Sequence, residues 1–335
     1  NDIRIVEVPI PEISADEILL KIKSAAVCGT DIRMWTNGQD GVDEKHPVTL
    51  CHEFSGIIDK IGKNVDSYKV GQRVAIAPNI GCGFCDNCII GNSHFCNNLK
   101  AFGIHLDGGF AEYIRITKEA IRGGNIMSIS DSTSFNAAAV NEAFSCTYNA
   151  FEHYNIFPGD TVLIIGAGAI GLMHAKLAFM AGAYKVIMND LSKERLLECK
   201  KRENRIIIKE IDLYETVMKE TDNEGVNVVI TACSVKEVQE TAFQYAALNG
   251  RVNFFGGLPK GQKVKLDTNE IHYKQLMVSG TTRSSHRQYK KTLEFVSKKL
   301  VDLDAIITDE FKIEDGIKAF ENAKGQKGLK QVIVF

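Results

Sequence analysis

The 335-residue sequence lacks most of the features that mark a disordered, nucleic-acid-binding or membrane-spanning protein. It contains only six prolines and no repetitive tract, which argues against disorder. Forty basic and forty-two acidic side chains leave a formal charge of -2, so no excess positive charge is available to hold nucleic acid or an anionic membrane surface. The most apolar stretch, residues 162–183, is broken by glycines and by His174 and Lys176, so it does not predict a membrane span.

The start of the chain has no apolar signal-peptide core, since it carries Asp2, Arg4 and Glu7. It begins with Asn1 and not with methionine, so we expect further residues to precede it. Nine cysteines are an odd total that does not fit a fully paired secreted framework. We therefore expect a protein of the reducing cytoplasm, and its length predicts roughly two globular domains.

The pattern of apolar residues changes along the chain. Up to about residue 135 it shows short alternations separated by turn residues, at 17–23, 55–61, 72–77 and 111–116, which predict a β-rich barrel or sandwich-like domain. Residues 136–154 read as a helix that ends before Phe157-Pro158-Gly159-Asp160. A helix at 288–299 and a strand at 331–334 are expected near the end of the chain.

Between these regions, apolar strands alternate with helices, which predicts a doubly wound parallel sheet of the α/β class. The expected strands are 161–165, 185–189, 206–208, 227–231, 251–255 and 276–279. The expected helices are 172–181, 193–201 and 235–247.

A dinucleotide fingerprint lies at the first strand of this sheet. Gly166-Ala167-Gly168-Ala169-Ile170-Gly171 follows an apolar strand, opens a helix and precedes a second strand that ends at Asp190. Gly166 permits the tight turn, Gly168 lets backbone approach the pyrophosphate, and Gly171 allows close helix–strand packing. Asp190 would accept hydrogen bonds from ribose hydroxyls and repel a 2′-phosphate, which favours NAD over NADP. The alternative is a structural glycine-rich turn with Asp190 as a helix N-cap.

Four cysteines form a compact motif, C-x2-C-x2-C-x7-C, in the lobe at residues 81–97. Four thiolates at this spacing can close tetrahedrally around one zinc, which predicts a structural site. An iron–sulfur cluster would favour another spacing of the last cysteine, and two disulfides do not suit a cytoplasmic chain. A zinc finger for nucleic acid would need a basic face, but Lys100 is the one formal cation between residues 81 and 100. The four cysteines are Cys82, Cys85, Cys88 and Cys96.

With these motifs the chain resembles the zinc-dependent medium-chain dehydrogenases, the superfamily of alcohol, polyol and threonine dehydrogenases, over essentially its whole length. The motifs that carry the resemblance, besides the lobe and the fingerprint, are Cys28-Gly29-Thr30-Asp31, His52-Glu53-Phe54-Ser55-Gly56, Gly108-Gly109-Phe110-Ala111-Glu112-Tyr113 and Asn141-Glu142-Ala143. The resemblance implies a Rossmann cofactor domain, residues 150–281, inserted in a β-rich GroES-like catalytic domain made of residues 1–149 and 282–335.

The resemblance also implies a catalytic zinc. Cys28 and His52 would be direct ligands. Glu53 would ligate directly or exchange on and off the metal, and Glu142 would bind zinc directly or through water. A thiolate, an imidazole and a carboxylate with an open fourth position suit zinc.

Further roles follow from the same resemblance. Thr30 would pass the alcohol proton toward the cofactor ribose, and Asp31 would orient His52. The nicotinamide ring would lie near Cys146 and Thr147. Taken alone, Cys28 would be a core thiol, His52 an ordinary histidine and Glu142 a surface charge.

The expected activity is hydride transfer between a secondary alcohol and NAD, with two zinc ions per chain. The substrate would be a polyol or sugar alcohol, possibly phosphorylated. The alternatives are an L-threonine 3-dehydrogenase-type enzyme and a catalytically inactive NAD-binding homologue. Arg283 and the following Ser284-Ser285-His286 would line a hydrophilic cleft, or Arg283 would be a surface cation. A homodimer or homotetramer is expected, with no nucleic acid or membrane partner.

The chain departs from the family pattern at three places. Cys51 stands where a glycine is usual, and Ala143 stands where a proline commonly follows the catalytic glutamate. Glu203-Asn204-Arg205 replaces a common Gly-Ala pair before the third strand of the cofactor domain. We interpret Cys51 as structural and not as a zinc ligand, because on a strand Cys51 and His52 would point to opposite faces. The cysteines at 146, 199 and 233 are assigned no chemistry.

Overall fold

The computed structural model describes residues 2–208 and 212–335. It separates into two compact units, one made of Asn1–Ser145 and Ser284–Phe335 and the other of Cys146–Arg283. We call them the β-rich unit and the parallel-sheet unit. The expected boundaries, after residue 149 and after residue 281, fall close to these. The chain therefore leaves the β-rich unit once and returns to it.

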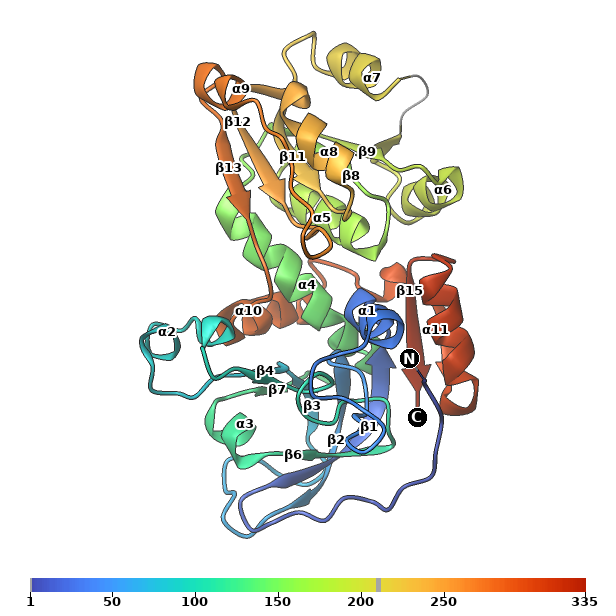
Figure 1. The fold of residues 1–335 in the computed structure, drawn as a ribbon. Helices are drawn as coiled ribbons and strands as arrows, with labels where there is room; N and C mark the ends of the chain where they lie inside the picture. Colours follow the sequence, from blue (N-terminus) through green and yellow to red (C-terminus); the bar gives the residue numbers. More distant parts are fainter. Residues whose placement is uncertain (1, 209–211) are drawn as a thin grey trace. The chain divides into compact units, whose positions relative to one another are not determined.

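The β-rich unit is organised around a seven-stranded sheet, in which β1 pairs with three other strands (Figure 1). Its order is β14-β15-β1-β2-β3-β7, with β6 also paired to β1, and every pairing is antiparallel except that of β14 with β15. The strands are β1 (Ile18–Ala26), β2 (Phe54–Ile61), β3 (Arg73–Ile76), β6 (Tyr113–Ile116), β7 (Ile126–Ser128), β14 (Ile307–Lys312) and β15 (Lys330–Val334); β4 (Asn79–Ile80) and β5 (Lys100–Ala101) form a separate pair.

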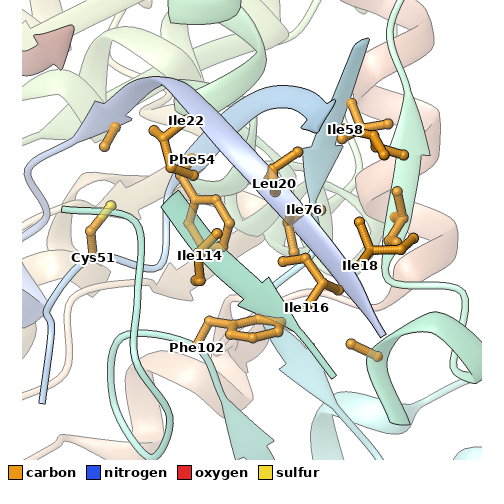
Figure 2. Packing of buried hydrophobic residues seen from close by; sticks show 14 of the residues in the cluster. Ile18, Leu20, Ile22, Cys51, Phe54, Ile58, Ile76, Phe102, Ile114 and Ile116 are labelled. Atoms are coloured by element: carbon orange, nitrogen blue, oxygen red, sulfur yellow. The ribbon is translucent and has the colours of Figure 1, made fainter. Parts of the chain in front are cut away.

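The core of this unit follows from the alternation of side chains along its strands. Ile18, Leu20 and Ile22 of β1 lie on one face and pack with residues from β2, β3 and β6 (Figure 2). Phe54 and Phe102 meet edge to face, with ring centroids 5.9 Å apart. Burying each such side chain contributes about 1.5–3 kcal/mol, so this cluster fixes the strand register from which the functional residues extend.

Among the described residues, six α-helices belong wholly or partly to the β-rich unit. The last of its long helices begins at a capping box, in which the Ser285 hydroxyl accepts from the Gln288 N–H and the Gln288 side chain accepts from the Ser285 N–H. The helices are α1 (Gly29–Asn37), α2 (Asp86–Ile89), α3 (Lys118–Arg122), α10 (His286–Ser297), α11 (Gly316–Lys324) and the first part of α4 (Phe135–Tyr154), which continues into the parallel-sheet unit.

The parallel-sheet unit confirms the predicted doubly wound fold. Its six strands are all parallel, in the order β10-β9-β8-β11-β12-β13, which is the Rossmann order (Figure 1). The strands are β8 (Thr161–Ile165), β9 (Lys185–Asn189), β10 (Ile207–Ile208), β11 (Val226–Thr231), β12 (Ala246–Phe254) and β13 (Met277–Gly280). The helices are α5 (Ala169–Met180), α6 (Lys193–Arg202), α7 (Leu213–Glu220), α8 (Lys236–Thr241) and α9 (Thr268–Tyr273).

One predicted element is wrong in part. The helix expected at 235–247 ends as α8 at Thr241, and a 3₁₀ turn, Ala242–Tyr245, leads directly into β12. The buried aromatic rings of Phe243 and Tyr245 pack in the core of this unit and draw the chain into the sheet early. Within the described residues, no helix has the length and apolar character needed to cross a membrane.

Candidate active site

The structure brings Cys28, His52 and Glu53 together in the β-rich unit. The thiol, one ring nitrogen and one carboxylate oxygen all lie within 4.8 Å of one another. Cys28 is the N-cap of α1, and His52 and Glu53 directly precede β2. The residues before β2 and the N-cap of α1 thus bring a thiol, an imidazole and a carboxylate together, a set that suits zinc.

Asp31 holds the two chain segments of this site in place. One of its carboxylate oxygens accepts from the backbone N–H of Cys28 at 2.9 Å, and the other accepts from the backbone N–H of Cys51 at 3.2 Å. The His52 Nδ1 atom lies 3.8 Å from the Asp31 carboxylate, within ion-pair range but beyond a hydrogen bond. Asp31 therefore positions the backbone on both sides of His52, while direct orientation of the ring stays a prediction.

The surroundings of His52 are strongly negative. Burial favours its neutral ring, but Cys28, Asp31 and Glu142 outweigh this effect and raise the pKa of His52 well above its ordinary value. Glu142, on α4, is only 6% exposed, yet it is not among the three groups that lie within 4.8 Å of one another. The site thus concentrates negative charge, which suits a divalent cation, and Glu142 contributes from farther away.

Glu53 is tied to Lys330, a residue that sequence reasoning missed. The Lys330 Nζ atom donates to Glu53 Oε1 at 2.7 Å, and both side chains are buried. Burial acts to lower the pKa of Lys330, but the charges of Glu53 and Cys28 outweigh it and raise this pKa. One carboxylate oxygen of Glu53 is therefore committed to Lys330, and Oε2 has no hydrogen-bond partner among the residues described. Oε2 is therefore the carboxylate oxygen that no hydrogen bond competes for if a metal binds.

Cys51 lies in the left-handed region of the backbone, with a φ of 84°. Residues 51–53 precede β2 instead of belonging to a strand, so the premise of alternating faces does not hold. The fully buried thiol donates to the carbonyls of Glu53, at 3.3 Å, and Ala26, at 3.6 Å. Burial raises the pKa of this thiol well above its usual range. These contacts agree with a structural Cys51, and the positive φ explains why glycine suits this position.

The four cysteines of the lobe also converge. Their sulfur atoms lie within 4.8 Å of one another, and Cys82 and Cys88 are separated by 4.0 Å between Sγ atoms. Tetrahedral thiolates at 2.3 Å from zinc would be about 3.8 Å apart. All nine cysteines of the chain lie in the described residues, and none forms a disulfide. Gly81 is required here, since a Cβ would lie 2.6 Å from the Cys88 sulfur. The lobe fits one structural zinc.

The glycine fingerprint has the expected geometry in the parallel-sheet unit. Gly166 follows β8 with a φ of 121°, where a Cβ would lie 2.8 Å from the Ala232 carbonyl oxygen. Gly171 passes so close to the Gly166 carbonyl that a Cβ would clash with it. Gly168 is the N-cap of α5, and a Cβ there would meet only the end of Arg195, at 3.4 Å. Its open side leaves room for a ligand at the helix N-terminus, with Ala169 and Ile170 in the first turn.

Asp190 follows β9 and faces this turn. Its carboxylate accepts from the backbone N–H of Ala167 at 2.7 Å and from that of Ser192 at 2.8 Å. Ser192, and not Asp190, is the N-cap of α6. Asp190 thus joins the fingerprint to the next helix. Arg195, which the sequence analysis did not single out, lies against Gly168.

The remaining predicted residues lie as follows. Thr30 is half-buried in the first turn of α1, and Thr147 is fully buried on α4. The serines and the histidine after Arg283 take part in local hydrogen bonds, and their place in a hydrophilic cleft stays a prediction. The Ser284 hydroxyl bonds that of Ser145, Ser285 caps α10, and His286 lies 3.0 Å from the Asn79 carbonyl.

Comparisons with known proteins agree with this architecture. The alcohol dehydrogenase GroES-like domain family matches residues 14–122, and the zinc-binding dehydrogenase family matches residues 169–298. The chain is 32% identical over 328 residues to sorbitol dehydrogenase of Bacillus subtilis (strain 168), with 96% of this chain and 91% of that protein covered. It is also 32% identical over 334 residues to L-threonine 3-dehydrogenase of the same organism, with 98% and 94% covered.

A solved structure shows the same fold. Galactitol-1-phosphate dehydrogenase from Escherichia coli superposes with a TM-score of 0.87 at 26% identity, covering 99% of this chain and 96% of that one. The two family matches, the relatives that align over nearly the full chain, and the two candidate metal sites lead to one conclusion. The chain belongs to the zinc-dependent medium-chain dehydrogenase superfamily, as its motifs predicted.

Proposed function

We propose that this protein is a zinc-dependent oxidoreductase that transfers a hydride between a secondary alcohol and NAD, with a polyol or sugar alcohol as substrate. The observation that carries the proposal is the cluster of Cys28, His52 and Glu53, a ligand set with room for a further ligand, in a chain that also has a dinucleotide fingerprint. An alcohol dehydrogenase-type oxidoreductase is the activity class of the family to which the chain belongs.

Cys28 and His52 would hold the catalytic ion, and the four lobe cysteines would hold a structural one. When bound at the first site, zinc would polarise an alcohol oxygen and lower its pKa, and NAD would supply the hydride acceptor. Glu53 offers a single free oxygen because Lys330 engages the other. Glu142 stands outside the compact cluster, so we assign it contact through water or upon exchange.

The protein's own groups orient the substrate and move its proton. Thr30, half-buried in the first turn of α1, would accept the proton of the alcohol hydroxyl and pass it toward the cofactor ribose. Asp31 keeps the backbone of Cys28 and Cys51 fixed, which limits the motion of the neighbouring His52. Such rigid placement is what the family's chemistry demands of the scaffold.

For the cofactor, Asp190 supports NAD. Its carboxylate accepts two backbone N–H groups, which hold it beside the turn where the adenosine ribose would bind. Arg195 beside Gly168 would contact the same part of the cofactor. We place the nicotinamide near Thr147.

The polyol assignment is supported by the sorbitol dehydrogenase relative and by the galactitol-1-phosphate dehydrogenase structure. Because of the second protein, a phosphorylated sugar alcohol is also a candidate substrate. L-Threonine is the second candidate, because a threonine dehydrogenase relative is equally similar in sequence. An inactive homologue is a weaker candidate, since Cys28, His52 and the fingerprint glycines are all present.

A homo-oligomer is also proposed. β13 forms the outer edge of the parallel sheet, and its outward side pairs with no strand in the described chain. Met277 and Val278 of β13 are exposed, as are Leu248 of the neighbouring β12 and Tyr273 of α9, and all of these except Val278 are at least 60% exposed. An unpaired strand flanked by exposed apolar side chains favours association with a second copy. Light scattering should therefore give a dimer or tetramer, and a monomer at micromolar concentration would contradict this.

The experiment that tests the function is a substrate panel with a zinc count. Sorbitol, xylitol, sugar-alcohol phosphates and L-threonine are each offered with NAD and with NADP, and zinc per chain is measured on the same preparation. Two zinc ions per chain and fastest NAD reduction with a polyol would support the proposal. Fastest turnover with L-threonine would transfer it to the alternative, and no turnover with any alcohol would refute it.

A further inference from the structure

A cavity of about 450 Å³ lies in the parallel-sheet unit, at a place that the proposed reaction does not use. Lys185 and Ile207, which begin β9 and β10, line it, so it lies at the edge of the sheet where these strands start. The glycine fingerprint and Asp190 follow the last residues of β8 and β9, at the opposite edge. The volume is that of a small-molecule site.

Small residues keep this space open. Gly159 and Gly182 line it with φ values of 95° and 99°, a backbone region that favours glycine, and a Cβ at Gly159 would meet no atom of the described residues within 4 Å. Another part of the wall is apolar and aromatic. Ile207 contributes a half-buried side chain, and Tyr184 is 72% exposed. The Tyr184 ring is thus an apolar surface that the folded chain leaves largely uncovered.

Arg205 places a positive charge at the cavity in one fixed orientation. Its guanidinium lies over the Phe179 ring, with Cζ 4.0 Å from the ring centroid. Nε and Nη2 donate to the two carboxylate oxygens of Glu203 at 2.8 and 3.0 Å. Nη1 makes no hydrogen bond within the described residues, and the Arg205 side chain is 58% exposed. Because the guanidinium is already ordered, its free edge can bind an anion at little further cost in conformational entropy.

The charges around the cavity favour an anionic ligand. Lys185 donates to Glu220 at 3.1 Å. The hydrogen bonds from Arg205 lower the pKa of Glu203, and the charge of Lys176 acts in the same direction. Three cations thus accompany two carboxylates, which leaves one positive charge uncompensated. The two carboxylates are the less exposed groups, at 11% and 25%, so the charge presented to solvent is that of Arg205.

We propose that this cavity binds a small aromatic carboxylate, whose ring packs against Tyr184 and Ile207 and whose carboxylate accepts hydrogen bonds from the free edge of Arg205. An aromatic ligand covers the exposed tyrosine ring, and hydrogen bonds between two charged groups are among the strong ones. The cavity and the cofactor turn lie at opposite edges of the sheet. The ligand would therefore bind together with NAD and not in its place.

The test is a calorimetric titration of the full-length protein with 2-naphthoate, with NAD at saturation so that the cofactor site is filled. We expect one binding event with a Kd of about 1 mM, which is usual for a ligand of this size. The neutral probe 2-naphthamide has the same rings and should bind about 10-fold more weakly. No binding of 2-naphthoate, or equal binding of the two probes, would overturn the proposal.

Arg205→Met removes the proposed anion contact and should weaken 2-naphthoate binding by about 10-fold or more, because a hydrogen bond to a charged group is lost. Arg202→Met is the matched control. Arg202 ends α6 and pairs with Glu198 at 2.7 Å, but it does not line the cavity. Its replacement should leave the Kd unchanged. Equal weakening in both variants would overturn the proposal, because it would reflect a general disturbance of this region.

Two further variants keep the test decisive if Arg205→Met fails to fold. Tyr184→Ser changes an exposed side chain and should weaken 2-naphthoate binding by about 3-fold or more, since the ring contact is lost. Cys28→Ser lies in the β-rich unit and should bind the probe as the wild type does. Unchanged binding in Tyr184→Ser, or loss of binding in Cys28→Ser, would overturn the proposal, because the probe would then occupy another site.

Discussion

Replacing Lys330 with methionine should destabilise the β-rich unit by more than any surface substitution. The Lys330 ammonium contacts Glu53 at 2.7 Å, and the two side chains are 7% and 0% exposed. Methionine fills a similar volume but leaves the Glu53 carboxylate buried without its counter-charge. Removing one partner of a buried pair costs about 3–5 kcal/mol, because the remaining charge has lost both its partner and water.

A double-mutant cycle distinguishes the loss of stability caused by the missing counter-charge from a loss caused by poorer packing. Lys330→Met, Glu53→Met and the double variant are unfolded in urea after metal removal, because Glu53 is a candidate zinc ligand and bound zinc would stabilise the variants unequally. Trp35, the one tryptophan of the chain, lies on α1 and packs on Phe320 of α11, so its fluorescence reports the unfolding of this unit. The double variant should recover most of the loss, since no buried charge remains.

Two results would refute this reasoning. A loss below about 1 kcal/mol in Lys330→Met would mean that the Glu53 charge is relieved by another group or by water. A double variant as unstable as Lys330→Met would show that the effect comes from packing and not from charge. Either result would also remove the argument that Lys330 limits Glu53 to one free oxygen.

Three further predictions concern other parts of the chain. Burial lowers the pKa of His174 to about 3, below its ordinary 6.5, so the neutral ring contributes stability that is complete above pH 6.5 and is lost as the pH falls from 6.5 toward 3. Between pH 7 and 4.5, the free energy of unfolding of the wild type should therefore fall by about 2–3 kcal/mol more than that of His174→Gln, in which the glutamine still offers Tyr154 an acceptor. Equal decreases in the two proteins, measured by far-UV dichroism, would contradict this prediction. Cys51→Gly should be about 1 kcal/mol more stable to urea than Cys51→Ala, because the φ of 84° favours glycine at a position where alanine would otherwise be the more stable residue. An alanine variant of equal or greater stability would show that this backbone relaxes. Cys85→Ser should lower the zinc content from two ions per chain to one, whereas an unchanged zinc count would remove the lobe as a metal site.

The parts that could be predicted from sequence are those fixed by short-range patterns. The parallel sheet follows from strands and helices that alternate at regular intervals, and the glycines of the fingerprint each answer a local steric demand, such as the clash that a Cβ at Gly171 would make with Gly166. The structural zinc site of the lobe could also be predicted, because four cysteines within one short loop are typical of a metal site. In these places local chemistry and fold agree.

The parts that could not be predicted depend on contacts between distant residues. Lys330 reaches Glu53 across 277 positions, and a lysine in a terminal strand reads as a solvent-exposed residue. The bond from Cys51 N–H to Asp31 depends on the left-handed turn at Cys51, which no residue pattern reveals. β14 and α11 were not predicted because their apolar residues are few and widely spaced. Tertiary packing decides such elements.

The measurement that tests the central claim most directly is the rate of NADH formation from a polyol by the wild type and by Cys28→Ser, with zinc per chain counted in both. We expect the wild type to hold two zinc ions and to reduce NAD, and the variant to keep the lobe zinc, lose the other ion and lose nearly all turnover. Unchanged polyol oxidation by Cys28→Ser would contradict the account, because no catalytic zinc at Cys28 and His52 would then be required.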